Sequence, residues 1–324
     1  MKYCFVINRF AGKGKYVEEL QKNIAEHCGN AGVEYGICLS DHIGAAKEYI
    51  EKLVSERKEG EEIAFFACGG DGTLCETVNA VMSLKDKSNV FVGLIPTGTG
   101  NDFVRNFGSS EPFFDIKAQI AAKPYYIDLL NCNGMYAINM VNIGFDCEVV
   151  VKTADMKKKP FIPSKFAYIA GLVATLIKKP GVSMKASEDG GEAKDARLLL
   201  TTFANGEFCG GGFHSNPRAK LNDSKIDTLF VNNISRMKFI SLVSYYKKGT
   251  HLDNERFAKI VTHKKLDRID MAFGKETNIS VDGEVIQAKE LSLSIESDAI
   301  GFLIPEGALS DGLDPVERLG EAII

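Results

Sequence analysis

The stretch Ala67-Cys68-Gly69-Gly70-Asp71-Gly72-Thr73 decides the fold of this chain. The apolar run Ile63–Phe66 before it predicts a buried strand, and the apolar spacing from Leu74 to Met82 after it predicts one face of a helix. Glycines on a strand-to-helix turn let the backbone approach a ligand closely, because no side chain stands in the way. The start of the helix adds unpaired N–H groups and the positive end of the helix dipole, which suit a phosphate.

The carboxylate of Asp71 within this turn indicates a cation. A carboxylate and a phosphate repel each other at short range, so a phosphate site that carries its own aspartate calls for a metal ion between them. The chain contains neither a P-loop nor a G-x-G-x-x-G dinucleotide fingerprint. We therefore expect Mg²⁺ and a nucleoside triphosphate at this turn.

A second glycine loop, Pro96-Thr97-Gly98-Thr99-Gly100-Asn101-Asp102, also follows an apolar strand. Asn101 or Asp102 could cap the helix that comes next, and a capped turn alone would explain a loop of this kind. Because the loop lies one strand-helix unit after the first, we expect both loops to hold one nucleotide from adjacent strand ends.

The first 125 residues alternate between strand and helix patterns, which predicts a parallel sheet with helices on both faces. Ligands of such sheets lie at the carboxyl ends of the strands, where the small-residue loops of this segment fall. The expected strands are 3–7, 35–39, 63–67 and 90–95, and the expected helices are 15–27, 43–56, 73–83 and one starting at 102–107.

From about Tyr126 the pattern changes to short strands with frequent turns, and Asn133-Gly134 marks a hairpin. This pattern of short strands and turns favours an antiparallel sandwich or barrel, interrupted by helices at 164–177 and 237–246. The predicted domains are a nucleotide-binding α/β domain at 1–125, rejoined by a helical tail within 306–324, and a β-rich domain with a helical insertion at 126–305.

Composition limits the functional classes. A net charge of −4 and a pI near 5.9 give no global field that favours nucleic acid, so no nucleic-acid partner is expected. The eight scattered cysteines form no C-x-x-C pair or zinc spacing and are interpreted as reduced thiols of a cytoplasmic protein. No apolar run reaches the ~18 residues of a membrane span.

Taken together, Gly69–Thr73 and Gly98–Phe103 resemble the diacylglycerol kinase catalytic-domain family, which includes bacterial soluble lipid kinases and is related to sphingosine and ceramide kinases. The first loop alone also resembles NAD kinases and phosphofructokinases. Further motifs follow in family order: Asn8–Gly14, Ile127–Leu129, Asn142–Asp146, Asn205 with Gly210–Gly212, Asp223 with Asp227, and Val281–Glu284. The resemblance implies an α/β parallel-sheet nucleotide domain of the NAD kinase and phosphofructokinase type, followed by a β-sandwich-like domain.

The resemblance also implies residue roles. Asp71 would hold Mg²⁺ or a water bound to it, Asp128 would add a second carboxylate, and Glu284, oriented by Asp282, would be the general base. The residues implied to contact ATP are Asn8, Ala11, Gly12, Lys13, Gly14, Ser40, Gly69, Gly70, Asp71, Gly72, Thr73, Thr97, Gly98, Thr99, Asn101 and Asp102. Plainer interpretations stay open: Asp282-Gly283 is also an ordinary hairpin turn, and Asp128 could cap a domain junction.

A second, structural Mg²⁺ is implied in the β-rich domain, bound by the Asp223 carboxylate and the carbonyls of Lys220 and Lys225. Asp223 could equally belong to a surface turn. Ser224 stands where the family has Gly, which makes a turn with positive φ costlier. Two other departures are Arg9 in place of Pro and Ser40 in place of Thr.

The resemblance predicts an ATP- and Mg²⁺-dependent lipid kinase that converts diacylglycerol to phosphatidic acid. The alternatives are a kinase of NAD or another soluble metabolite, and a non-catalytic regulator that binds nucleotide or lipid. Phe103-Val104-Arg105 after the second loop favours the lipid branch.

The sequence says less about how the protein contacts its lipid substrate. The apolar segment Phe161–Ile177 lies between Lys157–Lys159 and Lys178–Lys179, so it could dock on an anionic bilayer or pack on the sandwich with its lysine ends in water. We expect a cytoplasmic protein that meets its lipid substrate peripherally at a membrane surface. An exposed sheet edge would offer a route to a homodimer.

Overall fold

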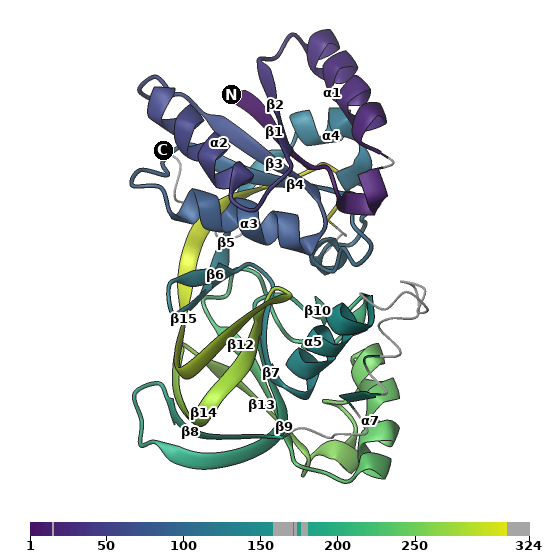
Figure 1. Cartoon of the computed structure of the whole chain (residues 1–324), viewed down its shortest axis with the longest axis vertical. Coiled ribbons are helices and arrows are strands. Elements are labelled where there is room, and N and C mark those ends of the chain that lie inside the picture. Colours follow the sequence, from purple (N-terminus) through teal and green to yellow (C-terminus); the bar gives the residue numbers. More distant parts are fainter. Residues whose placement is uncertain (15, 158–170, 172–173, 176–180, 310–324) are drawn as a thin grey trace. The chain divides into compact units, whose positions relative to one another are not determined.

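The computed structural model describes residues 1–14, 16–157, 171, 174–175 and 181–309, and it forms two compact units (Figure 1). The first unit comprises Met1–Asp128 and the described residues from Ser297 onward, and the second comprises Leu129–Glu296. The apolar segment predicted at 161–177 lies largely outside the described residues, and the tail helix predicted at 315–324 lies wholly outside them. Within the described residues, no helix combines the length and apolar character that a membrane span requires.

The first unit contains a parallel sheet in the order β2-β1-β3-β4, with the end of β15 beside β4. Each strand comes from an apolar run, and all seven residues of both β3 and β4 are buried. The strands are β1 (Lys2–Asn8), β2 (Tyr35–Ser40), β3 (Ile63–Gly69), β4 (Val90–Pro96) and β15 (Glu284–Ile304).

Helices cover both faces of this sheet, because alternate strand residues point to opposite sides. Phe5 and Phe66 pack with Leu20 and Ile24 of α1, whereas Phe65 meets Tyr49 of α2. The helices are α1 (Val17–Ala31), α2 (Ala45–Glu56), α3 (Asp71–Met82) and the short α4 (Ile116–Ile120). Short 3₁₀ turns form η1 (Ala11–Gly14), η2 (Phe103–Asn106) and η3 (Glu111–Phe114).

The predicted domain boundary near residue 305 is corrected by the course of β15. This strand begins in the second unit, but its last residues pair in parallel with β4, with Gly301 opposite Phe91 and Phe302 opposite Val92. Ser297–Ile304 therefore belong to the first unit, which extends at its other boundary to Asp128. The helix predicted from Asp102 is also shorter than expected and consists of the single turn η2.

The second unit is an antiparallel sheet that closes on itself. Its strands run in the order β13-β12-β9-β7-β14-β15, and β8 pairs with both β9 and β14, which closes the sheet around one apolar core. The strands are β7 (Met140–Gly144), β8 (Val182–Glu188), β9 (Lys194–Ala204), β12 (Ile226–Asn232), β13 (Val261–Leu266) and β14 (Arg268–Val281). β5 (Lys123–Cys132) and β6 (Met135–Ala137) form the hairpin predicted at Asn133-Gly134, which is confirmed.

Among the described elements, the helices α5 (Phe145–Lys157) and α7 (Arg236–Lys248) and a small hairpin lie outside this core. The two helices cover a second apolar cluster that includes Leu200 and Leu229 of the sheet. The hairpin joins β10 (Phe208–Cys209) to β11 (Phe213–His214) through three glycines with positive φ. One turn, η4 (Glu255–Phe257), precedes β13.

Candidate functional site

The two glycine loops predicted from the sequence touch each other at the carboxyl ends of β3 and β4. The backbone N–H groups of Thr97 and Gly98 donate to the carbonyl oxygen of Gly69, at 2.8 and 3.2 Å. A Cβ atom on Gly98 would lie 2.4 Å from the Cα of Gly70, which is closer than any real carbon contact. The contact therefore requires glycine at position 98.

Asp71 links the same two loops through its side chain. It is the first residue of α3, and its Oδ1 accepts a hydrogen bond from the backbone N–H of Phe103 at 3.1 Å. Its Oδ2 lies near Gly100, where an added Cβ would stand 3.1 Å away. No side chain caps α3 at Gly70, and although the Thr73 N–H donates to the Gly70 carbonyl oxygen at 3.0 Å, the N–H groups of Asp71 and Gly72 are left to a ligand or water. This geometry suits a phosphate beside the carboxylate.

The loop after β1 joins this edge through Asn8. The Asn8 Nδ2 donates to Thr73 Oγ1 at 3.0 Å, and its Oδ1 accepts from the N–H of Phe10 at 2.9 Å. Gly14 has a φ of +72°, and a Cβ there would lie 3.1 Å from the Arg9 carbonyl oxygen. Ala11–Gly14 form the turn η1, and the side chain of Lys13 lies outside the described residues.

The loop after β2 lies at the same edge of the sheet. The N–H of Arg9 donates to the carbonyl of Ser40 at 3.2 Å, and the N–H of Gly44 donates to Glu76 Oε1 of α3 at 3.0 Å. Ser40 itself is buried. Loops after four neighbouring strands thus meet at the carboxyl edge of the sheet, where ligands of parallel sheets bind.

In the second loop, neither Asn101 nor Asp102, the two residues predicted as helix caps, caps the turn η2 with its side chain. Asn101 adopts a φ of +48° and donates from Nδ2 to the Gly98 carbonyl at 3.0 Å, while its buried Oδ1 has no hydrogen-bond partner. Asp102 precedes η2 without capping it, and its Oδ1 lies 3.4 Å from Arg105 Nε. A buried acceptor without a donor is costly, so the Asn101 oxygen is available to a bound group. Thr99 is exposed in the same loop.

The oxygen atoms of these loops fit a magnesium ion that is shared with phosphate. Mg²⁺ takes oxygen ligands and is usually held by one or two carboxylates together with substrate phosphates. Asp71 and Asp102 would supply the carboxylates, since the Oδ2 atoms of both lie near Gly100, and Asn101 would supply the unpartnered oxygen. Among the described residues, no group of three or more His, Cys, Asp or Glu side chains could hold a metal ion alone.

Asp128 has a structural partner in the first unit. Its side chain is fully buried, and its Oδ1 accepts from the backbone N–H of Asp298 at 2.9 Å. The hydrogen bond fixes the segment in which β15 enters the first unit. This is the capping role left open from the sequence, and the role of Asp128 toward Mg²⁺ stays a prediction.

Asp282 and Glu284 lie on the turn between β14 and β15. Asp282 and Gly283 have φ angles of +47° and +94°, as in a two-residue hairpin. The Asp282 carboxylate accepts from three consecutive backbone N–H groups, at 2.7 Å from Ile138, 3.1 Å from Asn139 and 2.7 Å from Met140. These bonds fix the turn, and Glu284 extends from it as an exposed carboxylate at the start of β15.

The second magnesium site does not fit the turn at Asp223 as it lies. Ser224 adopts a φ of +57°, so serine maintains the turn despite the missing glycine. However, the Asp223 Oδ1 accepts from the N–H of Lys225 at 3.2 Å, and its Oδ2 forms an ion pair with Lys265 Nζ. The Lys265 ammonium group already supplies positive charge to the Asp223 carboxylate. The exposed Lys220 could offer a metal ion only its backbone carbonyl oxygen. The implied metal ligation therefore stays a prediction without support from this geometry.

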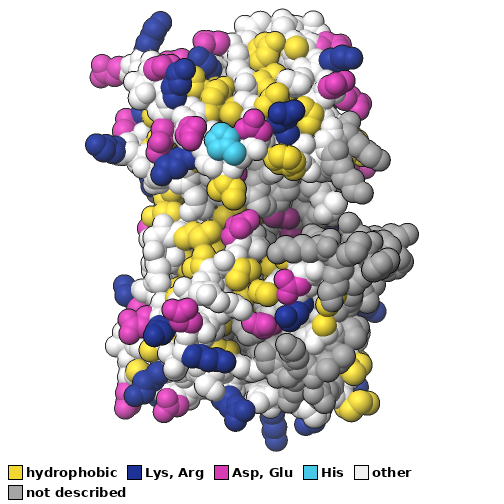
Figure 2. All heavy atoms as spheres, in the orientation of Figure 1, with side chains coloured by type: hydrophobic (Ala, Val, Ile, Leu, Met, Phe, Trp, Pro, Cys, Tyr) yellow, Lys and Arg dark blue, Asp and Glu magenta, His cyan; other side chains and the backbone are white. Residues whose placement is uncertain are grey.

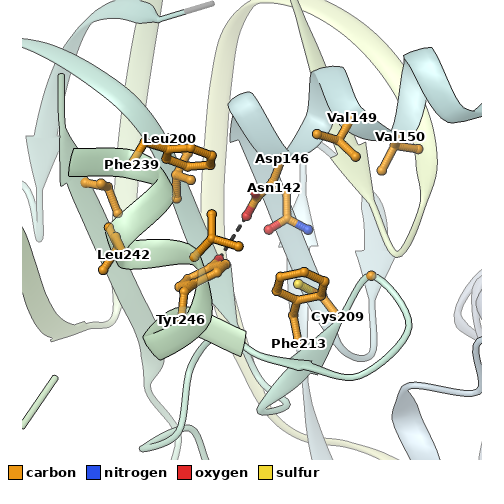
Figure 3. A pocket seen from close by; sticks show the side chains of 13 residues that line it. Asn142, Asp146, Val149, Val150, Leu200, Cys209, Phe213, Phe239, Leu242 and Tyr246 are labelled. Carbon is orange, nitrogen blue, oxygen red and sulfur yellow. Dashed lines mark hydrogen bonds between the residues drawn. The ribbon is translucent and has the colours of Figure 1, made fainter. Parts of the chain in front are cut away.

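A pocket in the second unit was not predicted as a site. It is a cavity of about 60 Å³ between α5, α7 and the sheet, lined mainly by apolar side chains (Figure 3). The side chains of Asn142 and Asp146 both line it, and the Tyr246 hydroxyl donates to Asp146 Oδ2 at 2.8 Å. Burial raises the pKa of Asp146 to about 6. In the sequence, the Asn142–Asp146 motif and the glycines Gly210–Gly212 pointed to this region, but not to a pocket.

Comparisons with known proteins match most of the chain. Residues 2–131 match the model of the diacylglycerol kinase catalytic domain, and residues 139–304 match that of the YegS C-terminal NAD kinase beta sandwich-like domain. A protein named putative lipid kinase from Staphylococcus epidermidis is 26% identical over 290 residues, which cover 89% of this chain and 90% of the relative. A protein also named putative lipid kinase, from Staphylococcus haemolyticus, is 24% identical over 292 residues, which cover 90% of this chain and 91% of the relative.

Solved structures share the fold. The crystal structure of a putative diacylglycerol kinase from Bacillus anthracis superposes with a TM-score of 0.73 at 22% identity, covering 95% of this chain and 96% of that chain. The predicted fold class, an α/β nucleotide domain followed by a β-sandwich-like domain, is confirmed by these matches.

Proposed function

The chain belongs to the diacylglycerol kinase catalytic-domain family, and we propose that it is an ATP-dependent lipid kinase that phosphorylates the hydroxyl group of diacylglycerol to give phosphatidic acid. The observation that supports this most strongly is the backbone contact between the Gly69–Thr73 and Thr97–Asp102 loops, which the Asp71 side chain reinforces. The relatives named putative lipid kinase favour a lipid acceptor.

The first-unit loops would bind and orient the triphosphate. Phosphoryl transfer depends mainly on positioning and on neutralising charge, so glycine backbone at Gly70 and Gly98 lets N–H groups approach the phosphates. The carboxylates of Asp71 and Asp102 would hold Mg²⁺, which when bound neutralises charge on the phosphate oxygens. Asn8 positions Thr73 through its side-chain hydrogen bond.

Glu284 is the proposed base for the lipid hydroxyl. An alcohol nucleophile gains from a carboxylate within hydrogen-bond reach that can accept its proton. The Glu284 side chain is exposed, and its carboxylate has no hydrogen bond or ion pair in the part of the chain that the structure describes, so it is available to accept a proton. Asp282 acts as a positioning residue, because its three backbone hydrogen bonds fix the turn from which Glu284 extends.

The test is a phosphate-transfer assay with separate acceptors. The purified chain is incubated with Mg²⁺ and ATP labelled at the γ-phosphate, together with mixed micelles of diacylglycerol, ceramide or sphingosine, or with NAD in solution. We expect label in the organic phase as phosphatidic acid. Label in NAD alone would establish the soluble-metabolite alternative, and tight ATP binding without transfer to any acceptor would point to a non-catalytic regulator.

A further inference from the structure

The outer face of α7 combines apolar and basic side chains. The helix sequence Arg236–Lys248 contains four basic residues and no acidic one. Met237 is 76% exposed and Ile240 is 52% exposed, one helical turn apart. Lys238, Lys247 and Lys248 are exposed on the same helix. In Figure 2, hydrophobic side chains lie at the edge of the molecule where Figure 1 places α7.

The inner face of α7 is firmly anchored, so the exposed face is held in place. Phe239, Leu242 and Tyr246 are buried in the apolar cluster beneath the helix, and the same side chains line the pocket. Ser235 caps the N-terminus by accepting from the Lys238 N–H at 3.3 Å, and Gly249 ends the helix in the left-handed conformation. Met237 and Ile240 therefore remain in water although the helix is fully formed.

Two exposed apolar residues among lysines are typical of a helix that lies in a membrane interface. Apolar side chains enter the boundary between headgroups and acyl chains, while lysines contact lipid phosphates at a negatively charged surface. The chain as a whole carries a net charge of −4, so attraction to an anionic surface has to come from a local basic region such as this one.

We propose that α7 docks the second unit on an anionic lipid bilayer through Met237 and Ile240, with Lys238, Lys247 and Lys248 contacting lipid phosphates. The proposal rests on the proposed function in one respect, since a lipid kinase has to reach lipid in a membrane. A second copy of the chain is a poorer occupant, because two such faces would bring lysines against lysines.

The test is sedimentation with vesicles in the absence of ATP. Vesicles of phosphatidylcholine alone are compared with vesicles of equal parts phosphatidylcholine and phosphatidylglycerol. We expect binding to the mixed vesicles that weakens as salt is added, because salt screens the lysine contacts. The double variant Met237→Glu/Ile240→Glu should bind roughly tenfold less or weaker still. Lys247→Gln/Lys248→Gln should lower binding to the mixed vesicles only.

A matched control separates docking from general surface hydrophobicity. Phe114 is 54% exposed in the first unit, so Phe114→Glu replaces one exposed apolar side chain by a glutamate elsewhere and should leave vesicle binding unchanged. Thermal unfolding of each variant confirms that it folds. Unchanged vesicle binding by the folded Met237→Glu/Ile240→Glu variant would overturn the proposal, and so would a dimer in light scattering that this variant abolishes.

The docking proposal and the proposed kinase activity can fail separately. Phosphate transfer to diacylglycerol in detergent micelles, together with absent vesicle binding, would keep the activity and overturn the docking. Vesicle binding that depends on Met237 and Ile240, without transfer to any lipid, would keep the docking and overturn the activity.

Discussion

Gly98 and Gly70 stand so close that a Cβ atom on Gly98 would lie 2.4 Å from the Cα atom of Gly70. This contact joins the loops that follow β3 and β4 at the carboxyl edge of the parallel sheet, where the N–H groups of Thr97 and Gly98 donate to the Gly69 carbonyl oxygen. Asp71 adds a side-chain hydrogen bond between the same loops. The geometry of the nucleotide site therefore depends on the small size of two residues and the charge of a third.

Gly98→Ala should weaken ATP binding. The added methyl group would push the two loops apart, and overpacking of this kind costs roughly 1–3 kcal/mol. We expect the KM for ATP to rise about tenfold or more in steady-state assays. Gly29→Ala is the control, because nothing lies within 4 Å of that position in α1. The control should leave the KM unchanged, and an equal effect of both variants would refute the loop contact.

Asp71→Asn should lower turnover while leaving the fold intact. The asparagine oxygen can still accept from the Phe103 N–H, but the charge that would hold Mg²⁺ is lost. We expect the rate to fall on the order of 100-fold. Asp115→Asn serves as the control, since Asp115 only caps α4 through the Lys117 N–H at 2.8 Å. A near-normal rate for Asp71→Asn would contradict its assignment.

Glu284→Gln should lower kcat without changing the affinity for ATP. The amide keeps the shape of the side chain but accepts a proton poorly, so we expect a loss of about 100-fold in transfer to diacylglycerol. Glu290→Gln alters an exposed carboxylate on the same strand and should have little effect. Loss of ATP binding in a calorimetric titration, with kcat preserved, would argue against Glu284 as the base.

Mg²⁺ should not stabilise the protein in the absence of nucleotide. The Lys265 ammonium already neutralises Asp223, so we expect the same melting temperature with Mg²⁺ and with EDTA. Lys265→Ala should lower stability by about 1 kcal/mol at most, since the pair is partly exposed. A clear rise in the melting temperature of the unaltered protein with Mg²⁺ would restore the metal site implied by the family resemblance.

Asp146 should make the protein less stable as pH rises. Burial raises the pKa of Asp146 in the folded state to about 6 from an ordinary value of 3.8, so the folded state holds a proton that the unfolded chain releases between these values. Stability from this group is present below pH 4 and is lost as pH rises through 6. Asp146→Asn should be the more stable protein at pH 8, by roughly 2–3 kcal/mol.

Titration of His251 makes the protein more stable as pH rises, opposite to the effect of Asp146. The unfolding free energy of the Asp146→Asn variant therefore has to be compared with that of the unaltered protein at each pH. Burial lowers the pKa of His251 to about 4, and its contribution to stability therefore grows between pH 4 and 6.5. Only the difference in unfolding free energy between Asp146→Asn and the unaltered protein isolates Asp146. A difference that does not change between pH 4 and pH 8 would contradict the raised pKa.

The parallel sheet and the glycine loops could be predicted from the sequence because their signals are local. Apolar runs bounded by glycines identify β3 and β4, and Asn133-Gly134 identifies a hairpin through the backbone angles that these residues favour. Neighbouring parallel strands place their following loops at one edge, which brings Gly70 and Gly98 together.

Features that depend on distant pairing could not be predicted. The bonds from Asp282 to residues 138–140 cross more than 140 positions, and the pair of Asp223 with Lys265 follows from the register of β12 against β13. Periodicity shows that β15 is a strand, but its partner β4 is a matter of tertiary packing. The pocket beside Asp146 likewise arises where α5 and α7 meet the sheet.

The most direct measurement is a crystal structure of the protein with Mg²⁺ and a non-hydrolysable ATP analogue. The account predicts the phosphates against the backbone of Gly69–Thr73 and Thr97–Asp102, with the metal ion beside Asp71. A nucleotide bound elsewhere, or these loops left without phosphate at saturating analogue, would contradict it.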